Sequence, residues 1–408
     1  VGDLFSSDAE PHQQAALAYL DGLNEFINNG NTPPEFSILH IPKKPFDKTD
    51  ILQVAGYMAL GFAGGIEEDM LVSKLSEKLE EKYLADLAID WVEGTERIAS
   101  YPLADSLLQQ FSSLQLSVRD HLPVPLLIGS NSWVLGSGKS TSGHAVLCND
   151  THIGFRQPAV WYEAHLNYPG NNFFGKFLAG FPFAPIGNNE STAIGITMLE
   201  NDDTNLHLEK IKEENRQYLS NGEWLPLEII YDTIPVQGAE DIPFEVRSTL
   251  NGPIINNLEL LPLSNSTNAI SLWWLYLQNP GDFLKAAYDW SHAENLEDVQ
   301  RAAALVGAPG LNVMYADKED NIAWFATAKL PILEGENSKF LMSADSAPKD
   351  FLHFGQNPHN VNPPEDYVYS ANNQPEPFSG FIHPGYYVPE DRAKRITHLL
   401  DNKSTWTV

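Results

Sequence analysis

The sequence of 408 residues has little cysteine, little positive charge and no long apolar run, and each shortage excludes a class of protein. Its single cysteine, Cys148, can form no disulfide within the chain and no zinc or iron–sulfur site with several thiolate ligands. Lysine and arginine number 25 against 54 aspartate and glutamate residues, and the net charge of −29 disfavours a nucleic-acid partner, because phosphate groups bind to cationic surfaces. No apolar run reaches the roughly 18 residues of a membrane-spanning helix, so no membrane span is expected.

Apolar residues are nevertheless plentiful enough for a folded protein. Hydrophobic residues make up 43% and aromatic residues 11%, more than a disordered acidic chain carries. The length allows two or three domains, and no low-complexity linker divides the chain. The first residues, Val1-Gly2-Asp3, show no signal-peptide pattern, and because the first residue is not methionine we expect that an N-terminal segment was removed or left out.

The hydrophobic pattern changes near residue 123. Before it, from residue 11 to about 119, apolar residues recur mostly at helical spacing; after it, short β-type runs are separated by Gly, Asn and Ser. Because helices and strands fall in blocks and do not alternate regularly, the predicted fold class is α+β with layered sheets. Helices are predicted again over 206–219 and 296–305, and strands over 132–135, 144–147, 193–197, 312–316 and 322–325.

Two motifs suggest chemistry that the surrounding residues do not support. Gly136-Ser137-Gly138-Lys139-Ser140-Thr141 resembles the end of a phosphate-binding loop, but Trp133 stands where the first glycine is required, and a β-type run follows where a helix must begin. A polar hairpin turn is predicted instead. The histidines include no pair at metal-ligand spacing with a carboxylate on one helix face, so zinc catalysis has little support.

The bond between Gly129 and Ser130 is the most informative position. It joins two small residues after an apolar run and immediately before a predicted strand, where an autoprocessed precursor would be cut. A serine at a new N-terminus carries an amine with a reference pKa of about 7.7 to 8.0 beside its hydroxyl, so one residue supplies both base and nucleophile. On this local pattern alone, an ordinary serine in a turn is the competing interpretation.

Several blocks of sequence carry a family resemblance. Ser130-Asn131-Ser132-Trp133-Val134 resembles the start of the β-subunit in the penicillin acylase family of N-terminal nucleophile hydrolases, which includes penicillin, cephalosporin and acyl-homoserine-lactone acylases. Two blocks before it resemble the α-subunit, so the resemblance covers nearly the whole chain. The other blocks, in order, are Tyr19 to Ile27, Pro33-Pro34-Glu35-Phe36, Asn149-Asp150-Thr151-His152, Gly187-Asn188-Asn189, Gly195-Ile196-Thr197-Met198, Asn201-Asp202-Asp203, Asn251-Gly252-Pro253, Asn312 to Asp317, Ser370-Ala371-Asn372-Asn373 and Arg392-Ala393-Lys394-Arg395-Ile396.

The resemblance implies a four-layer αββα fold and an amidohydrolase that cleaves linear N-acyl amides through an acyl-enzyme. Residues 1–129 would form an α-chain and residues 130–408 a β-chain, the two chains of one processed precursor. Family chains extend further at both ends, so we expect a fragment that is truncated at its C-terminus. The family is commonly exported, which implies a periplasmic or secreted location.

The resemblance also implies the catalytic roles. Ser130 is the nucleophile, and His152 stands where the family contacts the nucleophile's hydroxyl or amine. Glutamine stands there in enzymes that act on penicillin G, whereas histidine is similar to acyl-homoserine-lactone and cephalosporin acylases. The backbone amide of Met198 and the side-chain amide of Asn312 would stabilise the oxyanion. Taken alone, His152 is as easily a hydrogen-bonding residue at a strand end and Asn312 a turn or cap residue.

Two further sites follow from the family positions. Oxygen ligands for a structural Ca²⁺ would come from Asp202, the Thr204 carbonyl, Asn205 and a carboxylate of the α-part, with Glu67 the best candidate; a solvated acidic turn is the alternative. The acyl pocket would be lined by three aliphatic residues that favour an aliphatic acyl chain and are otherwise ordinary core residues: Ile153, Ile186 and Ile196.

The chain also departs from the family pattern. Many members carry an arginine shortly after the strand that Asn312 begins, yet here Lys329 is the only cation in the segment that follows. The predicted substrate is an N-acyl homoserine lactone or another aliphatic N-acyl amide. The alternatives are a β-lactam acylase, an unprocessed inactive precursor and a calcium-stabilised scaffold.

Overall fold

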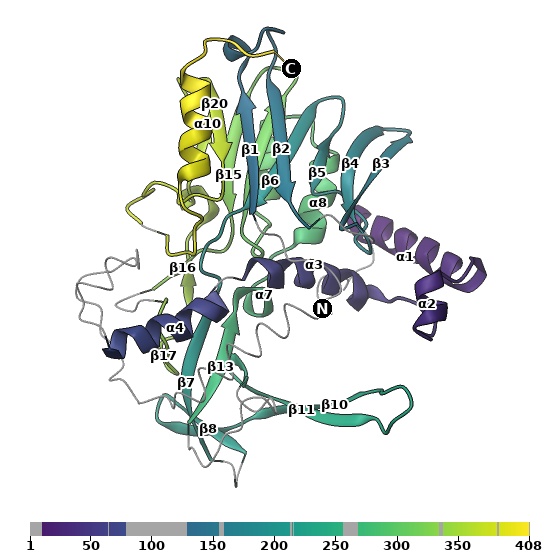
Figure 1. Ribbon diagram of the computed structural model, residues 1–408, viewed down its shortest axis with the longest axis vertical. Coiled ribbons are helices and arrows are strands. Elements are labelled where there is room, and N and C mark those ends of the chain that lie inside the picture. Colours follow the sequence, from purple (N-terminus) through teal and green to yellow (C-terminus); the bar gives the residue numbers. More distant parts are fainter. Residues whose placement is uncertain are drawn as a thin grey trace.

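The computed structural model describes residues 10–63, 65–78, 129–154, 159–212, 214, 216–255, 268–333, 338–381 and 383–407 (Figure 1). The N-terminal part is helical, as predicted. Pro11 begins the first helix. Asp47 precedes the third helix as its N-cap, and its carboxylate accepts hydrogen bonds from the backbone of Thr49 and Asp50 in a capping box. The helices are α1 (Pro11–Asn29), α2 (Pro34–Ile38), α3 (Lys48–Phe62) and α4 (Gly65–Lys78).

A seven-stranded sheet forms the centre of the molecule. Helices α8 (Phe283–Ser291) and α9 (Leu296–Ala303) pack on one of its faces, together with α1 and α3. Hydrophobic side chains form the core between them, with Trp290 and Val313 each no more than 1% exposed. In order across the sheet the strands are β19 (His359–Val361), β15 (Ile322–Thr327), β14 (Leu311–Asp317), β6 (Thr192–Met198), β5 (Ile186–Asn188), β4 (Asn171–Leu178) and β3 (Trp161–Tyr168).

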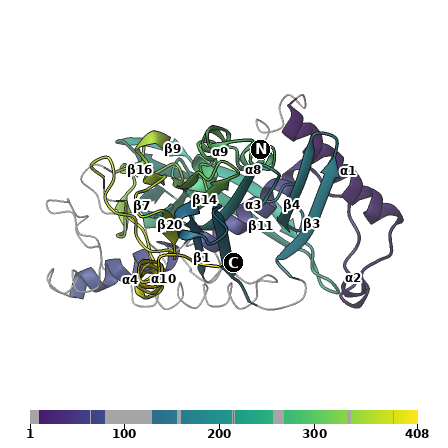
Figure 2. The same cartoon turned by 90° about the horizontal axis from the view of Figure 1, so that it is seen from above.

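A three-stranded sheet packs against the other face. Its strands lie in the order β2 (Val146–His152), β1 (Gly129–Leu135) and β20 (Tyr367–Ser370), and Val134 meets Met314 of the larger sheet in a buried cluster. Helix α10 (Asp391–Asp401) covers the outer face, so the order of layers is helix, sheet, sheet, helix (Figure 2). The predicted αββα layering is confirmed.

A second group of strands extends away from these layers (Figure 1). A five-stranded sheet contains β13 (Asn268–Trp274), β7 (Thr204–Lys212), β8 (Gln217–Ser220), β9 (Glu223–Pro226) and β17 (Met342–Ser343). Beside it lies a ribbon of β10 (Glu228–Ile234), β11 (Ile242–Thr249) and β12 (Gly252–Pro253). The short elements are α7 (Leu275–Gln278), β16 (Pro331–Ile332) and β18 (Asp350–Phe351).

The structure corrects one predicted helix. Residues 206–219, predicted to be helical, form β7 and the start of β8. His207 and Glu209 are polar yet fully buried, so burial along this strand does not follow the alternation of polar and apolar residues that indicates a strand in a sequence. The helix predicted over 296–305 is confirmed as α9, and the predicted hairpin turn joins β1 to β2 with a short 3₁₀ turn at Ser137–Lys139.

Candidate active site

Ser130 lies at the start of the central strand of the three-stranded sheet. It is the second residue of β1, pairs with Thr151 of β2 and is 2% exposed. Its side chain points toward the larger sheet, where the backbone N–H of Met198, the last residue of β6, donates a hydrogen bond to Ser130 Oγ over 3.3 Å. The structure therefore brings together two of the residues predicted to carry the chemistry, the hydroxyl of Ser130 and the amide of Met198.

The side chain of Asn372 touches both polar atoms of Ser130. Its Oδ1 accepts from the Ser130 backbone nitrogen at 2.7 Å, and its Nδ2 donates to Ser130 Oγ at 3.1 Å and to the Met198 carbonyl at 2.9 Å. Asn372 is fully buried just after β20, with a backbone φ of 63°. Asparagine tolerates this left-handed conformation better than most residues, and the turn directs its amide at Ser130.

Arg392, in the first turn of α10, binds both Ser130 and the Asn372 side chain that contacts Ser130. Its Nη1 donates to the Ser130 carbonyl at 2.7 Å and to Asn131 Oδ1 at 2.5 Å, and its Nη2 donates to Asn372 Oδ1 at 2.9 Å. A guanidinium presents several donors in a rigid plane, so it holds three acceptors in one arrangement. The segment directly after β15 contains Lys329 and no arginine, and the guanidinium beside Ser130 comes from α10.

His152 ends β2 opposite Gly129, the residue before Ser130. Its side chain is 34% exposed, and Nε2 lies 3.1 Å from both Asn131 Nδ2 and Asp150 Oδ2. Since Asn131 also contacts Arg392, His152 is linked to the backbone of Ser130 through the side chains of Asn131 and Arg392.

Asn312, at the start of β14, belongs to the same buried network, and its hydrogen bonds go to residues around Ser130. Its Nδ2 donates to the Met198 carbonyl at 2.9 Å and lies 3.0 Å from Thr197 Oγ1, while Trp324 Nε1 donates to its Oδ1 at 2.8 Å. Asn312, the predicted oxyanion donor, is thus connected to Ser130 through Met198. The side-chain amide in contact with Ser130 Oγ is that of Asn372.

Gly129 has a conformation and surroundings that suit only glycine. Its φ is 156°, and a Cβ at this position would lie 3.3 Å from Arg392 Nη2 and 3.3 Å from Asn372 Oδ1. Because both groups also contact Ser130, the predicted processing bond lies inside the same network of hydrogen bonds.

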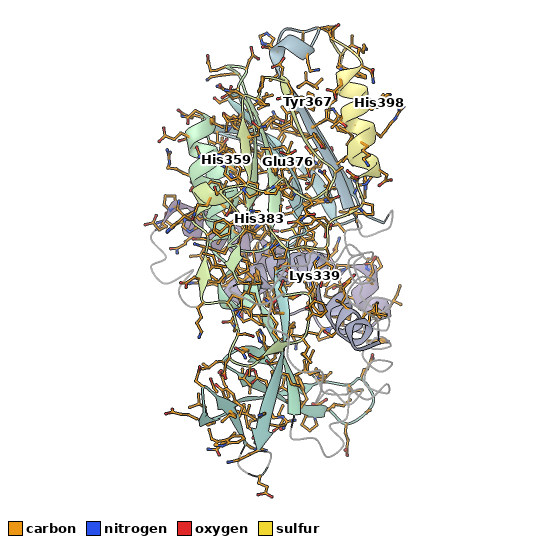
Figure 3. All side chains as sticks on the ribbon, turned by 90° about the vertical axis from the view of Figure 1, so that its left-hand side faces the viewer. Lys339, His359, Tyr367, Glu376, His383 and His398 are labelled. Carbon is orange, nitrogen blue, oxygen red and sulfur yellow. The ribbon has the colours of Figure 1, made fainter. Side chains whose placement is uncertain are left out.

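A buried acidic cluster lies where α4 meets β7. Asp69 and Asp202 are at most 2% exposed, and Tyr386 donates to Asp69. Burial, followed by the charge of Asp202, raises the pKa of Asp69 well above its usual value, and burial raises the pKa of Asp202 to about 6. Lys339, labelled in Figure 3, lies 5.1 Å from the centre of the Tyr386 ring and adds a positive charge nearby.

Of the predicted calcium ligands, Asp202 and Thr204 lie together beside Gly65 of α4, and Asn205 follows Thr204 in β7. Asp202, Thr204 and Asn205 are buried, and oxygens of all three side chains accept no hydrogen bond of ordinary geometry from the described residues. The side chain of Glu67 lies outside the described residues, and Asp69, two positions further along α4, lies against Asp202. Within the described part of the chain, no three histidine, cysteine or carboxylate side chains meet as metal ligands, so an ion here would also need neutral oxygen ligands.

The three isoleucines predicted to line an acyl pocket are distributed differently. Ile196 is 3% exposed within the core between the large sheet and its helices, and Ile186 is half-buried against the same core. Ile153 directly follows His152 and is half-buried. Ile153 is thus next to a predicted catalytic residue in the chain, and Ile186 and Ile196 contribute to core packing.

Sequence reasoning assigned no role to Asn372 or Arg392, although both stand in blocks that carry the resemblance. Two signals were available. Asparagine is enriched at left-handed backbone positions, and arginine in the first turn of a helix opposes the helix dipole unless it has another partner. Neither signal names the partner, because Ser130 is 242 positions from Asn372 and 262 from Arg392.

The sequence and the fold match known proteins. The family model of penicillin amidase matches residues 3–408. An acyl-homoserine lactone acylase, QuiP, from Pseudomonas aeruginosa is 25% identical over 96% of this chain and 49% of its own length, and penicillin G acylase from Escherichia coli is 28% identical over 95% and 53%. The crystal structure of a thermostable penicillin G acylase from Alcaligenes faecalis matches with a TM-score of 0.61 and 23% identity, over 68% of this chain and 50% of that chain.

The two curated relatives match nearly all of this chain, but the chain spans only about half the length of each relative. No helix in the described ranges is long and apolar enough to cross a membrane.

Proposed function

Because the chain belongs to the penicillin amidase family, we propose that it hydrolyses the amide bond of a small N-acyl substrate through Ser130 as an N-terminal nucleophile. The observation that carries the proposal is the set of contacts on one residue. Ser130 Oγ meets the Met198 N–H and the Asn372 amide, and Ser130 N meets Asn372 Oδ1. Hydroxyl, incipient amine and hydrogen-bond donors thus lie within one buried cluster.

The chemistry follows from these contacts. Once the bond to Gly129 is cut, the Ser130 amine accepts the hydroxyl proton as Oγ bonds to the substrate carbonyl carbon. The negative charge that develops on the carbonyl oxygen requires preorganised donors. The Met198 N–H and the Asn372 amide already contact Oγ, and the Asn312 amide bonds to the carbonyl of the same Met198. The C–N bond then breaks and the amine leaves with the proton; water next adds to the acyl carbon, the C–Oγ bond breaks, and the acid and free Ser130 are released.

Processing precedes this reaction. In the uncut chain the Ser130 nitrogen is an amide that donates to Asn372 and has no basic lone pair. Cleavage between Gly129 and Ser130 would give chains of about 14 and 31 kDa, in proportion to the 45.4 kDa of the whole. These are the α-chain of residues 1–129 and the β-chain of residues 130–408.

The acyl group is proposed to be aliphatic, as in an N-acyl homoserine lactone. Ile153 next to His152 supports this choice, as does the similarity to acylases named for acyl-homoserine lactones. The 28% identity to penicillin G acylase supports a β-lactam substrate as the second candidate. Hydrolysis of hexanoyl, decanoyl, phenylacetyl and glutaryl amides of one amine separates the two, since an aliphatic pocket favours the first pair.

A structural Ca²⁺ is proposed between the helical part and β7. Asp69, Asp202, Thr204 and Asn205 would hold it, because buried oxygens without hydrogen bonds are suited to a hard cation. The ion would supply positive charge that offsets the repulsion between the two aspartates. Its role would be to fix α4 against β7 and not to take part in the reaction.

Intact mass and N-terminal sequencing under denaturing conditions test the proposal first. Two chains, the larger beginning Ser-Asn-Ser-Trp, together with a labelled acyl-enzyme on Ser130, would support it. A single chain that forms no acyl-enzyme would favour an unprocessed precursor or a scaffold. A Ser130→Ala variant that hydrolyses amides as fast as the native protein would contradict the proposal. Export to the periplasm or the medium, proposed from the family, is tested by fractionating cells that produce the natural gene product.

A further inference from the structure

One ring nitrogen of His152 makes two contacts that no single protonation state satisfies. Nε2 lies 3.1 Å from Asn131 Nδ2 and 3.1 Å from Asp150 Oδ2. The amide nitrogen of Asn131 is a donor, and the carboxylate oxygen of Asp150 is an acceptor. A protonated Nε2 donates to Asp150, whereas an unprotonated Nε2 accepts from Asn131. The position of one proton therefore decides which neighbour His152 bonds.

The orientation of the Asn131 amide is fixed by Arg392. Arg392 Nη1 donates to Asn131 Oδ1, and because a guanidinium has no acceptor, the oxygen must face Arg392 and the nitrogen must face His152. The same Nη1 donates to the Ser130 carbonyl at 2.7 Å. The ring of His152 is thus connected to the backbone of the nucleophile through Asn131 and Arg392.

Asp150 favours the proton on Nε2. Without that proton, Nε2 and the carboxylate would place two acceptors 3.1 Å apart, which is repulsive. In a neutral ring, a proton on Nε2 leaves the lone pair on Nδ1. Nδ1 is the nitrogen that faces Gly129, since it lies 3.6 Å from the position that a Cβ of Gly129 would take. The free lone pair is therefore on the side of the Gly129–Ser130 segment.

We propose that Asp150 is a positioning residue that holds the proton on Nε2 of His152 and so presents the basic Nδ1 to the segment that carries Ser130. This inference deepens the acylase function proposed above and rests on it. The side chains of His152 and Asp150 are 34% and 64% exposed, so water competes for their hydrogen bond. The expected effect is about threefold to tenfold, the size expected for the loss of one ordinary hydrogen bond.

Nitrogen NMR of protein labelled with ¹⁵N-histidine tests the proton position directly. The His152 signal is identified as the one that disappears in His152→Gln. We expect the Nε2–H tautomer in the native protein and a threefold to tenfold shift toward Nδ1–H in Asp150→Ala. His144, in the turn between β1 and β2, lies 3.4 Å from Asp320 of the β14–β15 turn and provides the control, because Asp320→Asn should leave the His152 signal unchanged. A native Nδ1–H tautomer, or no shift in Asp150→Ala, would overturn the proposal.

Kinetics of amide hydrolysis separate this inference from the function on which it rests. Asp150→Ala should lower kcat threefold to tenfold with KM nearly unchanged, and Asp150→Glu, which keeps a carboxylate, should recover part of the loss. If the tautomer responds but the processed native protein hydrolyses no amide, the proton placement stands and the acylase function fails. If the native protein turns over and Asp150→Ala retains its full kcat, the positioning role fails and the acylase function stands.

Discussion

Asn372 contacts both reactive atoms of Ser130 with one side chain, through Oδ1 at 2.7 Å from the backbone nitrogen and Nδ2 at 3.1 Å from the hydroxyl oxygen. The orientation of the amide is fixed, because its oxygen also accepts a hydrogen bond from Arg392 Nη2 and its nitrogen also donates to the Met198 carbonyl. In the proposed mechanism, an asparagine held in this way would set the position of the base, the Ser130 nitrogen, relative to the nucleophile, the Ser130 hydroxyl oxygen.

The first prediction concerns Asn372→Asp. The variant keeps the shape and an acceptor for the Ser130 nitrogen, but it replaces the donor by a second oxygen that faces Ser130 Oγ and the Met198 carbonyl. We expect kcat for amide hydrolysis to fall about a hundredfold or more, the magnitude typical for loss of a preorganised donor. The neighbouring Asn373, whose Oδ1 accepts from the Ala371 backbone, provides the matched control, and Asn373→Asp should change kcat less than threefold. Equal losses in both variants would show that Asn372 has only a structural role.

The second prediction concerns the three hydrogen bonds that the Arg392 guanidinium donates. Lysine keeps the charge but cannot donate to three acceptors at once, so Arg392→Lys should lower kcat/KM about tenfold and Arg392→Met about a hundredfold. Arg395 is exposed on the same helix, and Arg395→Met should leave kcat/KM unchanged. A fully active Arg392→Met would mean that the guanidinium does not organise the nucleophile.

The strands of the αββα layers could be predicted from the sequence, whereas strand β7 of the five-stranded sheet could not. The strands around Trp133, Ile194 and Val313 are apolar and short, so their pattern indicated the layered sheets correctly. The helix predicted over the outer strand β7 is wrong. Buried Glu209 accepts hydrogen bonds from Thr249, Asn251 and Ser271, so it lies in the core despite its charge. Such compensation depends on residues far along the chain and leaves no local pattern.

The site was predictable where it depends on sequence motifs and not where it depends on the tertiary fold. The Gly129–Ser130 bond and the Met198 amide were both identified from their blocks, and the structure places that amide on Ser130. The roles of Asn372 and Arg392 require knowledge of how β20 and α10 pack beside β1, which no local spacing encodes.

The third prediction concerns calcium. If Ca²⁺ occupies the cluster of Asp69 and Asp202, saturating calcium should raise the melting temperature by about 3 to 6 °C over the protein in EGTA, and magnesium should not replace it. Asp202→Asn should abolish the response, whereas Asp241→Asn, an exposed change in the loop between β10 and β11, should preserve it. Titration calorimetry measures the binding independently of activity. An unchanged melting temperature together with no heat of binding would leave the cluster without a metal.

The fourth prediction concerns Glu209 and pH. Burial raises the pKa of this carboxyl, although hydrogen bonds from Ser271, Thr249 and Asn251 act in the opposite direction. Between the unfolded pKa of about 4.3 and the raised folded pKa, the folded state binds more protons, so the free energy of unfolding falls as pH rises. Glu209→Gln retains the oxygen acceptor and removes the titration, and it should flatten this slope in urea unfolding measured at pH 5 and pH 7. The exposed Glu223→Gln should leave the slope as it is, and the same slope in Glu209→Gln would contradict the assignment.

The last prediction separates crowding from backbone strain at the processing bond. Gly129→Ala places a methyl group 3.3 Å from both Arg392 Nη2 and Asn372 Oδ1, at a φ of 156° that residues with side chains rarely adopt. Both groups must shift, and because they orient Ser130, cleavage of the Gly129–Ser130 bond should slow at least about tenfold, as followed by the appearance of the two chains on denaturing gels. Gly143, in the turn between β1 and β2, has a φ of 73° but no atom within 4 Å of its Cβ position, so Gly143→Ala carries the strain without the crowding. Cleavage at the native rate in Gly143→Ala and slow cleavage in Gly129→Ala would assign the effect to the Arg392 and Asn372 contacts, whereas equal slowing of both would assign it to a general loss of stability in the hairpin.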